Sequence, residues 1–266
     1  MHDATRGLRP VAGDRAPRPA DASPYPVGVG ASSGARRASR SADAHGRGHA
    51  VKGVFVTGTD TGVGKTLIST ALVRAYAAQG LRVAGLKPVV SGMVAGGLYE
   101  DVEALRRASE PPRTVGECAL YAFPPAIAPH FAAGQAGCRI DLQAIERFVR
   151  EQARDVERVV VEGAGGFLVP LTPTAGFADL AAALALPVVL VVGLRLGAIN
   201  HALLTCEAIG ARKLPLAGWV GTWLAPDLAA GTLEGLRDFM PVPCLGIIPY
   251  HAPLDPEFAA RHLIIP

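Results

Sequence analysis

The sequence predicts an α/β domain built on a single doubly wound, mostly parallel sheet. Two observations lead to this fold class. From Val51 onward, short apolar runs alternate with stretches whose apolar residues recur at helical spacing. Several of the apolar runs consist almost entirely of Val, Leu and Ile, which is typical of strands that helices cover on both faces.

The first predicted strand, Gly53–Thr57, leads into a glycine-rich loop. The segment Gly58–Thr66 reads GTDTGVGKT and fits the phosphate-loop (Walker A) pattern G-x-x-x-x-G-K-[ST]. Glycines let backbone N–H groups curl around phosphate oxygens, the Lys65 ammonium can reach the β- and γ-phosphates, and the Thr66 hydroxyl can ligate Mg²⁺. A helix predicted at Thr66–Gln79 follows, and its N-terminus adds a positive dipole end for phosphate.

The later elements continue the same alternation. They are taken from apolar runs bounded by Gly, Pro or charged residues and from amphipathic stretches between those runs. The predicted strands are Arg82–Lys87, Arg158–Glu162, Val188–Val192, Leu216–Thr222 and Cys244–Ile248. The predicted helices are Glu100–Ala108, Leu142–Arg154, Phe177–Ala185, Ala198–Ile209 and Thr232–Phe239. The sequence has no visible internal repeat, so we expect residues 49–266 to form one domain.

The first 48 residues differ from the rest in composition. They are rich in Ala, Arg, Gly, Ser and Pro and have almost no bulky apolar residues. Such a segment cannot bury enough surface to offset the entropy of ordering it, so we expect a disordered tail. It has no apolar stretch typical of a secretory signal.

Composition and charge indicate which partners, membrane segments and cellular compartment to expect. The net charge is +3, and the first 50 residues alone contribute eight Arg and four Asp, which is +4 and leaves −1 for the remainder. Because no basic stripe interleaved with aromatics appears, we expect no nucleic-acid partner. The longest apolar run, Ala181–Leu194, is too short to span a membrane and contains Pro187. The four cysteines are scattered without metal or disulfide spacing, so we expect a cytoplasmic protein.

Three further polar residues stand where the phosphate loop needs chemistry. Glu162 follows three valines, and an acid at the tip of a buried strand needs a cation, for which Mg²⁺ is the natural candidate. Lys87 precedes Pro88, which makes a fixed turn that aims the lysine toward the γ-phosphate. Asp101 opens a predicted helix. An ordinary strand-end acid, a surface lysine and a helix N-cap are the alternatives, and spacing does not separate Asp101 from Glu100 and Glu103 as a metal ligand.

Position adds support to the nucleotide reading. In open parallel sheets, ligands bind beyond the carboxyl ends of the strands. The phosphate loop, Lys87 and Glu162 all stand at such ends, as do Arg195, Asn200 and Thr222.

Taken together, the motifs resemble one known family. GTDTGVGKT is followed in order by KPVVSG, VEGAGG with FADL, LPVVLVVGLRLGAINHALLT, LAGWVGT and the closing LGIIPY. This series is similar to dethiobiotin synthetases and covers nearly all of Val51–Pro266. The resemblance implies an ATP- and Mg²⁺-dependent ligase that closes a cyclic urea on 7,8-diaminononanoate with CO₂, releasing ADP and phosphate.

The resemblance also implies roles for individual residues and a homodimer. Lys65 and Lys87 are the implied catalytic residues, which stabilise phosphate and carbamate. Thr66, Asp101 and Glu162 are the implied Mg²⁺ ligands. The implied nucleotide contacts are Gly62, Val63, Gly64, Lys65, Thr66, Glu162, Gly163, Ala164, Gly165, Thr222, Pro249 and Tyr250. The implied substrate contacts are Thr61, Lys87, Ser91, Gly165 and, acting from the other subunit, Asn200.

Two departures from the family pattern and two rival functions follow. Gly62 stands where some members carry an acid, so a direct side-chain role at that position is lost. Thr222 stands where many members carry an Asn that reads adenine, so the preference for ATP is open. A cobyrinate-type amidoligase is one rival, although such chains usually add a glutaminase domain. A partitioning or metallochaperone switch ATPase is the other, although those carry a lysine early in the loop where this chain has Thr59.

Overall fold

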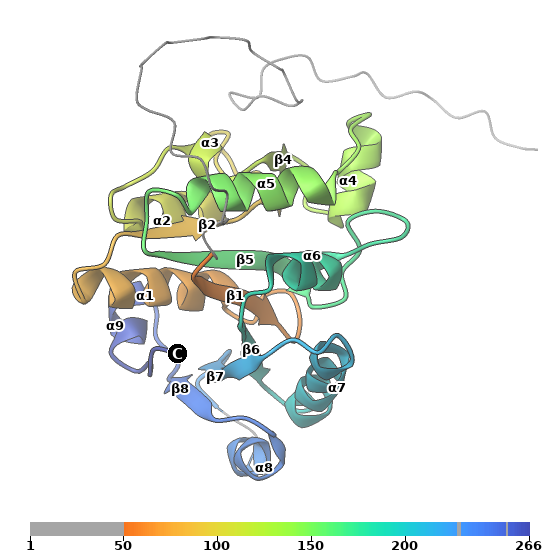
Figure 1. Cartoon of the computed structure of the whole chain (residues 1–266). Coiled ribbons are helices and arrows are strands. Elements are labelled where there is room, and N and C mark those ends of the chain that lie inside the picture. The colour runs from red at the N-terminus through yellow and green to blue at the C-terminus, as the bar shows by residue number, and fades with distance from the viewer. Residues whose placement is uncertain (1–50, 228–229, 254) are drawn as a thin grey trace, which may run out of the picture.

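A six-stranded parallel sheet organises the part of the chain that the structure describes (Figure 1). The structure is a computed structural model and describes residues 51–227, 230–253 and 255–266; the tail predicted at residues 1–48 lies outside them. The spatial order of the strands is β2-β5-β1-β6-β7-β8, and every neighbouring pair is parallel. The strands are β1 (Gly53–Gly58), β2 (Val83–Leu86), β5 (Arg158–Gly166), β6 (Val188–Leu194), β7 (Leu216–Trp223) and β8 (Cys244–Ile248).

Helices cover both faces of this sheet, so the predicted doubly wound α/β fold is confirmed. Strand β6 shows why, because its seven residues are all buried and alternate between two layers. Val189 and Val191 pack toward α1 (Lys65–Ala78), α2 (Glu100–Ala108) and α9 (Pro256–Ala260). Leu190 and Val192 pack on the opposite face toward α7 (Ala198–Ala211) and α8 (Thr232–Phe239). Helices α5 (Leu142–Gln152) and α6 (Phe177–Leu184) cover the rest of that second face.

Each buried aliphatic side chain of these layers stabilises the fold by about 1.5–3 kcal/mol relative to exposure, so two-sided burial makes the centre of the sheet rigid. A rigid sheet fixes the positions of the loops at its carboxyl end. Those loops carry the polar residues singled out by the sequence.

Five short elements were not predicted from the sequence. Strands β3 (Val89–Ser91) and β4 (Tyr121–Phe123) form a separate two-stranded parallel sheet. The others are α3 (Val115–Cys118), α4 (Pro129–Gln135) and α9. At three to seven residues each, they are too short for a periodic pattern to develop.

One predicted boundary is wrong in a way that matters for the site. The strand expected to end at Glu162 continues to Gly166, because Gly166 pairs with Gly58 across an irregular step in the β1–β5 register. Glu162 therefore lies inside β5, where the fold surrounds its side chain completely. Lys87 immediately follows β2 and does not belong to it.

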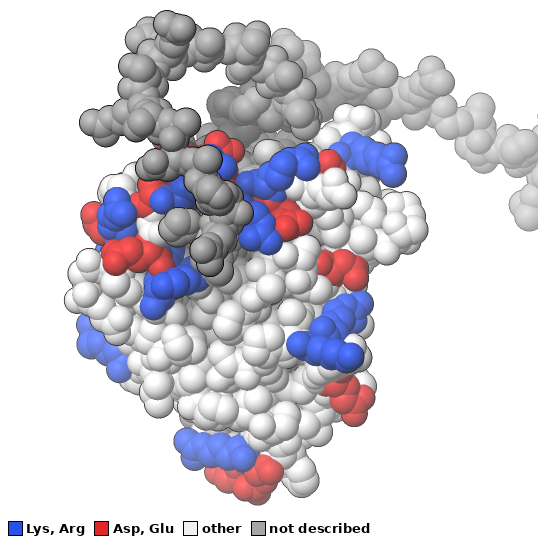
Figure 2. All heavy atoms as spheres, in the orientation of Figure 1, with Lys and Arg blue, Asp and Glu red and all other residues white. Residues whose placement is uncertain are grey.

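Charged side chains are unevenly distributed on the face shown in Figure 2. Lys and Arg are interspersed with Asp and Glu over the upper part, where α2 and α5 lie, the middle of the face is largely uncharged, and smaller groups of both signs lie at its right and lower edges. Within the described residues, no helix is long and apolar enough to cross a membrane.

Candidate active site

The loop between β1 and α1 is fixed by its own backbone and by a neighbouring strand. Gly64 has a φ of 87°, and a Cβ added there would lie 3.3 Å from Cγ2 of Thr222. The Thr222 hydroxyl donates a hydrogen bond of 2.7 Å to the carbonyl oxygen of Val63. Thr222, at the end of β7, therefore uses its hydroxyl to hold the phosphate loop.

Lys65 is a buried cation at the start of α1. Its ammonium donates a 2.7 Å hydrogen bond back to the carbonyl oxygen of Asp60, so the side chain curls over the loop that it belongs to. Burial, and then the nearby ammonium of Lys87, lower the pKa of Lys65 to about 8. A phosphate group beside Lys65 would oppose both effects, because its negative charge favours the charged ammonium.

Lys87 lies between two carboxylates. Its Nζ is 2.6 Å from Oε1 of Glu162 and 2.9 Å from Oδ2 of Asp101, and its side chain is only 4% exposed. Burial alone would lower the pKa of Lys87, but the two carboxylates outweigh it and hold that pKa above its usual value. We expected Glu162 to meet a cation, and in the structure that cation is the Lys87 ammonium.

Thr66 faces the same two carboxylates from the first turn of α1. Its Oγ1 is 2.6 Å from Oδ1 of Asp101 and 2.9 Å from Oε1 of Glu162. Burial would raise the pKa of Asp101, but Lys87 and the Thr66 hydroxyl hold it below its usual value. A hydroxyl and two carboxylates from three separate elements thus converge on one point.

This oxygen cluster fits a magnesium ion. The second carboxylate oxygen of Glu162, Oε2, is buried and has no hydrogen-bond partner among the described residues. A buried carboxylate oxygen without a partner is costly, and a cation would satisfy it. Mg²⁺ prefers oxygen ligands and is usually held by one or two carboxylates plus substrate phosphates. A magnesium site of this kind does not require three or more His, Cys, Asp or Glu ligands, and the described residues contain no such group.

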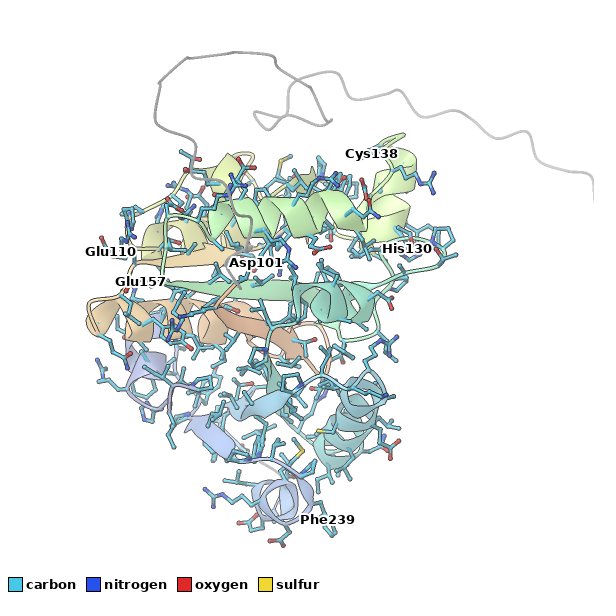
Figure 3. The ribbon with its side chains drawn as sticks, viewed as in Figure 1. Asp101, Glu110, His130, Cys138, Glu157 and Phe239 are labelled. Atoms are coloured by element: carbon cyan, nitrogen blue, oxygen red, sulfur yellow. The ribbon has the colours of Figure 1, made fainter. Side chains whose placement is uncertain are left out.

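The geometry separates the three acids that spacing left open. Helix α2 begins at Glu100, so Asp101 lies in its first turn and is not its N-cap. Glu103 is held by Arg106 and Arg107 at 2.7 and 3.1 Å, and Glu100 is exposed at the cavity rim. In Figure 3, Asp101 lies inward beside β5, well away from Glu110 and Glu157 at the amino end of the sheet. Of the three, Asp101 alone contacts both Thr66 and Lys87.

A cavity of about 800 Å³ opens over this cluster. Eleven of the predicted site residues line it: Thr61, Gly62, Gly64, Lys65, Thr66, Lys87, Ser91, Asp101, Glu162, Ala164 and Gly165. The lining also includes the segment 126–129, before and into α4, and Val169, none of which was predicted. These are small or apolar residues in a Pro-rich stretch, and no spacing distinguishes them from an ordinary loop.

A smaller cavity of about 200 Å³ lies on the other side of the phosphate loop. The predicted residues Thr222, Pro249 and Tyr250 line it, and Gly62 and Gly64 are shared with the larger cavity. Trp223, His251 and Phe258 also line it, and none of the three was predicted. An aromatic-lined hollow next to a phosphate loop suits a flat heterocycle.

Three predicted contacts line neither cavity. Val63 is buried in the core beneath the loop, and only its carbonyl meets Thr222. Gly163 lies against the rings of Phe55 and Phe177. Asn200 is exposed in the first turn of α7 and lines neither cavity of its own subunit.

Known proteins are similar to this chain over most of its length. The ATP-dependent dethiobiotin synthetase BioD of Nitrosospira multiformis is 48% identical over 214 residues, which are 80% of this chain and 92% of that protein. The protein of the same name from Ralstonia nicotianae is 46% identical and covers 79% of this chain and 94% of its own length.

The chain belongs to the dethiobiotin synthetase family.

The resemblance predicted from the motifs is thereby confirmed. A family model described as an AAA domain also matches residues 52–258 of this member of the dethiobiotin synthetase family. Among solved structures, the ParA family ATPase from Chlorobium tepidum is similar with a TM-score of 0.51, at 12% identity, over 76% of this chain and 86% of that one. The septum site-determining protein MinD from Pyrococcus horikoshii has a TM-score of 0.50, at 13% identity, over 75% of this chain and 81% of its own. At such low identity, these two likenesses concern the fold alone.

Proposed function

We propose that this chain is an ATP- and Mg²⁺-dependent dethiobiotin synthetase, which closes the cyclic urea of dethiobiotin from 7,8-diaminononanoate and CO₂. The observation that carries the proposal is the convergence of Lys65, Lys87, Thr66, Asp101 and Glu162 under one cavity, in a chain 48% identical to a protein of that name. Phosphoryl transfer needs positioning and charge neutralisation more than covalent help, and this cluster supplies both.

The chain's residues divide the work by charge. One amine of the substrate, as its carbamate, attacks the γ-phosphorus, so that ADP leaves and a carbamic–phosphoric anhydride forms. The second amine then attacks the carbonyl carbon of the anhydride and phosphate leaves. Lys65 neutralises the phosphate oxygens from the loop side. Lys87, held between Asp101 and Glu162, stabilises the carbamate and the charge that develops on the transferred group.

Thr66, Asp101 and Glu162 are the residues that would hold Mg²⁺. When bound, that ion would draw charge from the β- and γ-phosphate oxygens and orient them. Thr61, Ser91 and Gly165 line the cavity on the side where the diamine would lie. The smaller aromatic cavity takes the nucleotide base in this proposal, with Pro249 and Tyr250 at its wall.

The proposal includes a homodimer and a cytoplasmic location, both expected from the sequence. Two leucines beside Asn200 support the dimer: Leu196 is 88% exposed and Leu204 is 57% exposed. Apolar side chains this exposed, next to a predicted substrate contact, suit a surface that a second copy covers. Sedimentation at assay concentration should give a dimer, and an active monomer would contradict this part of the proposal.

The decisive experiment measures which components release ADP. Purified protein with ATP and Mg²⁺ should release ADP only when both diaminononanoate and bicarbonate are present, with one dethiobiotin formed for each ADP. Omitting either component should abolish turnover, because the attacking carbamate cannot form. Hydrolysis of ATP alone would instead favour the switch-ATPase alternative, and a requirement for glutamine would favour the amidoligase.

A further inference from the structure

An ion pair joins the tip of the phosphate loop to the loop that follows β6. The Arg195 guanidinium lies 2.6 Å from Oδ2 of Asp60, and both side chains are 47% exposed. Arg195 stands at the carboxyl end of β6, and the chemistry proposed above gives it no part. Asp60 is the residue of the phosphate loop whose carboxylate it holds.

Asp60 connects this arginine to two residues of the proposed machinery. Its Oδ1 accepts a 2.7 Å hydrogen bond from the backbone N–H of Thr61. Its carbonyl oxygen accepts the 2.7 Å hydrogen bond from the Lys65 ammonium. One residue therefore contacts Arg195 with one carboxylate oxygen, Thr61 with the other and Lys65 with its backbone.

The loop has little else to fix its tip. Just before the tip, the Thr59 N–H bonds to the Val191 carbonyl at 3.0 Å, and just after it, Thr222 holds Val63. Between these anchors lie Asp60, Thr61 and Gly62, all partly or fully exposed. Gly62 has a φ of 73°, and a Cβ added there would meet nothing within 4 Å, so no packing restrains it. Besides the Lys65 ammonium, which bonds to the Asp60 backbone, the Arg195 contact is the side-chain restraint from another element that the described structure shows at this point.

The pair is too exposed to stabilise the fold appreciably. Exposed ion pairs typically contribute about 0–1 kcal/mol to stability, because water screens them and both side chains lose freedom. The carboxyl of Asp60 stays charged at neutral pH, since the Thr61 N–H and then Arg195 hold its pKa below the usual value. A charged contact with little effect on stability is suited to setting the position of a loop.

We propose that Arg195 is a positioning residue, which holds Asp60 and thereby places Thr61 and the Lys65 ammonium for the triphosphate. The inference rests on the proposed function, since it assigns these two residues to the triphosphate and the carbamate. Arg195 acts through Asp60 and makes no contact of its own with the reacting groups.

A double-mutant cycle tests this indirect action. Arg195→Gln should raise the KM for ATP about five-fold, which is the change in a binding constant that loss of one exposed ion pair can produce. The kcat should change less. Arg195→Lys should recover most of the loss. Asp60→Asn should have a similar effect, and adding Arg195→Gln to Asp60→Asn should cost nothing further, because the contact is already weakened. The dissociation constant of MgADP, measured by calorimetry, should follow the same pattern.

Arg150→Gln is the matched control. Arg150 is 45% exposed and pairs with Glu146 at 2.8 Å on α5, outside both cavities, so its loss should leave the KM for ATP unchanged. Melting temperatures of all single variants should stay close to that of the unaltered protein.

Two outcomes would overturn the inference. An unchanged KM and MgADP affinity in Arg195→Gln would show that the loop tip needs no such restraint. A further loss on adding Arg195→Gln to Asp60→Asn would show that Arg195 acts directly on a ligand. The calorimetric arm requires no diamine, so it tests the loop even if the protein were found to make a product other than dethiobiotin.

Discussion

Replacing Lys87 with alanine should lower the turnover number by about 10²–10³-fold, the usual effect of removing one preorganised charge donor from a dry site. The loss should appear in kcat, because the ammonium of Lys87 is placed for charge that develops during transfer. Steady-state kinetics with saturating ATP, bicarbonate and diaminononanoate would measure it. The substitution should leave MgADP affinity less affected, since Lys65 contacts the phosphate loop independently.

The same substitution should also destabilise the protein when metal is absent. Lys87 neutralises Glu162, which is completely buried, and removing one partner of a buried ion pair typically costs about 3–5 kcal/mol. Adding MgCl₂ should restore part of the melting temperature, because a cation between the two carboxylates replaces the lost charge. The kinetic comparison therefore belongs at a temperature where circular dichroism shows the variant folded.

Lys52→Ala provides the control for Lys87→Ala. Lys52 is exposed just before β1 and lines neither cavity, so its removal should change neither turnover nor the response to MgCl₂. Turnover of folded Lys87→Ala close to that of the unaltered protein would remove Lys87 from the catalytic set. A melting temperature insensitive to MgCl₂ would contradict the placement of a cation between Glu162 and Asp101.

The strands and long helices could be predicted because their periodicity is local. Strand β6 is an uninterrupted apolar run, and α5 has a clear amphipathic pattern. The spatial order of the strands could not be predicted, because pairing β5 between β2 and β1 depends on side-chain fit between residues far apart in the chain. The extension of β5 to Gly166 has the same origin, since Gly166 pairs with Gly58 across 108 positions of sequence, 166 minus 58.

The type of site and its place in the fold could be predicted from the sequence, but the contacts between its side chains could not. A phosphate-loop pattern and the rule that ligands lie beyond strand ends were sufficient to bring Lys65, Lys87 and Glu162 to one edge of the sheet. The direct pairing of Lys87 with Glu162 was not expected, because charge pairing inside a protein depends on distances of a few ångströms that no spacing encodes. The Thr222–Val63 and Arg195–Asp60 contacts were missed for the same reason.

Replacing Glu162 with glutamine should weaken Mg²⁺ binding by about 10–100-fold, the range that loss of a supporting group already produces in metal sites. Glutamine keeps the volume of the side chain and removes its charge. One of its two polar ends becomes an NH₂ donor, which would point either at the Lys87 ammonium or at the space beside Oε2, and each placement is unfavourable. Turnover should fall, and the Mg²⁺ concentration for half-maximal activity should rise.

Metal affinity gives the sharper reading of Glu162→Gln, because activity alone would not separate a lost ligand from a misplaced Lys87. Mn²⁺ as a paramagnetic stand-in for Mg²⁺ reports binding by electron paramagnetic resonance, with and without ADP. Glu100→Gln is the matched control, since Glu100 is an exposed acid at the rim of the same cavity and adjoins Asp101. It should change Mn²⁺ affinity little. If Glu162→Gln and Glu100→Gln bind Mn²⁺ as tightly as the unaltered protein, Glu162 is not a ligand, and its burial serves only to hold Lys87.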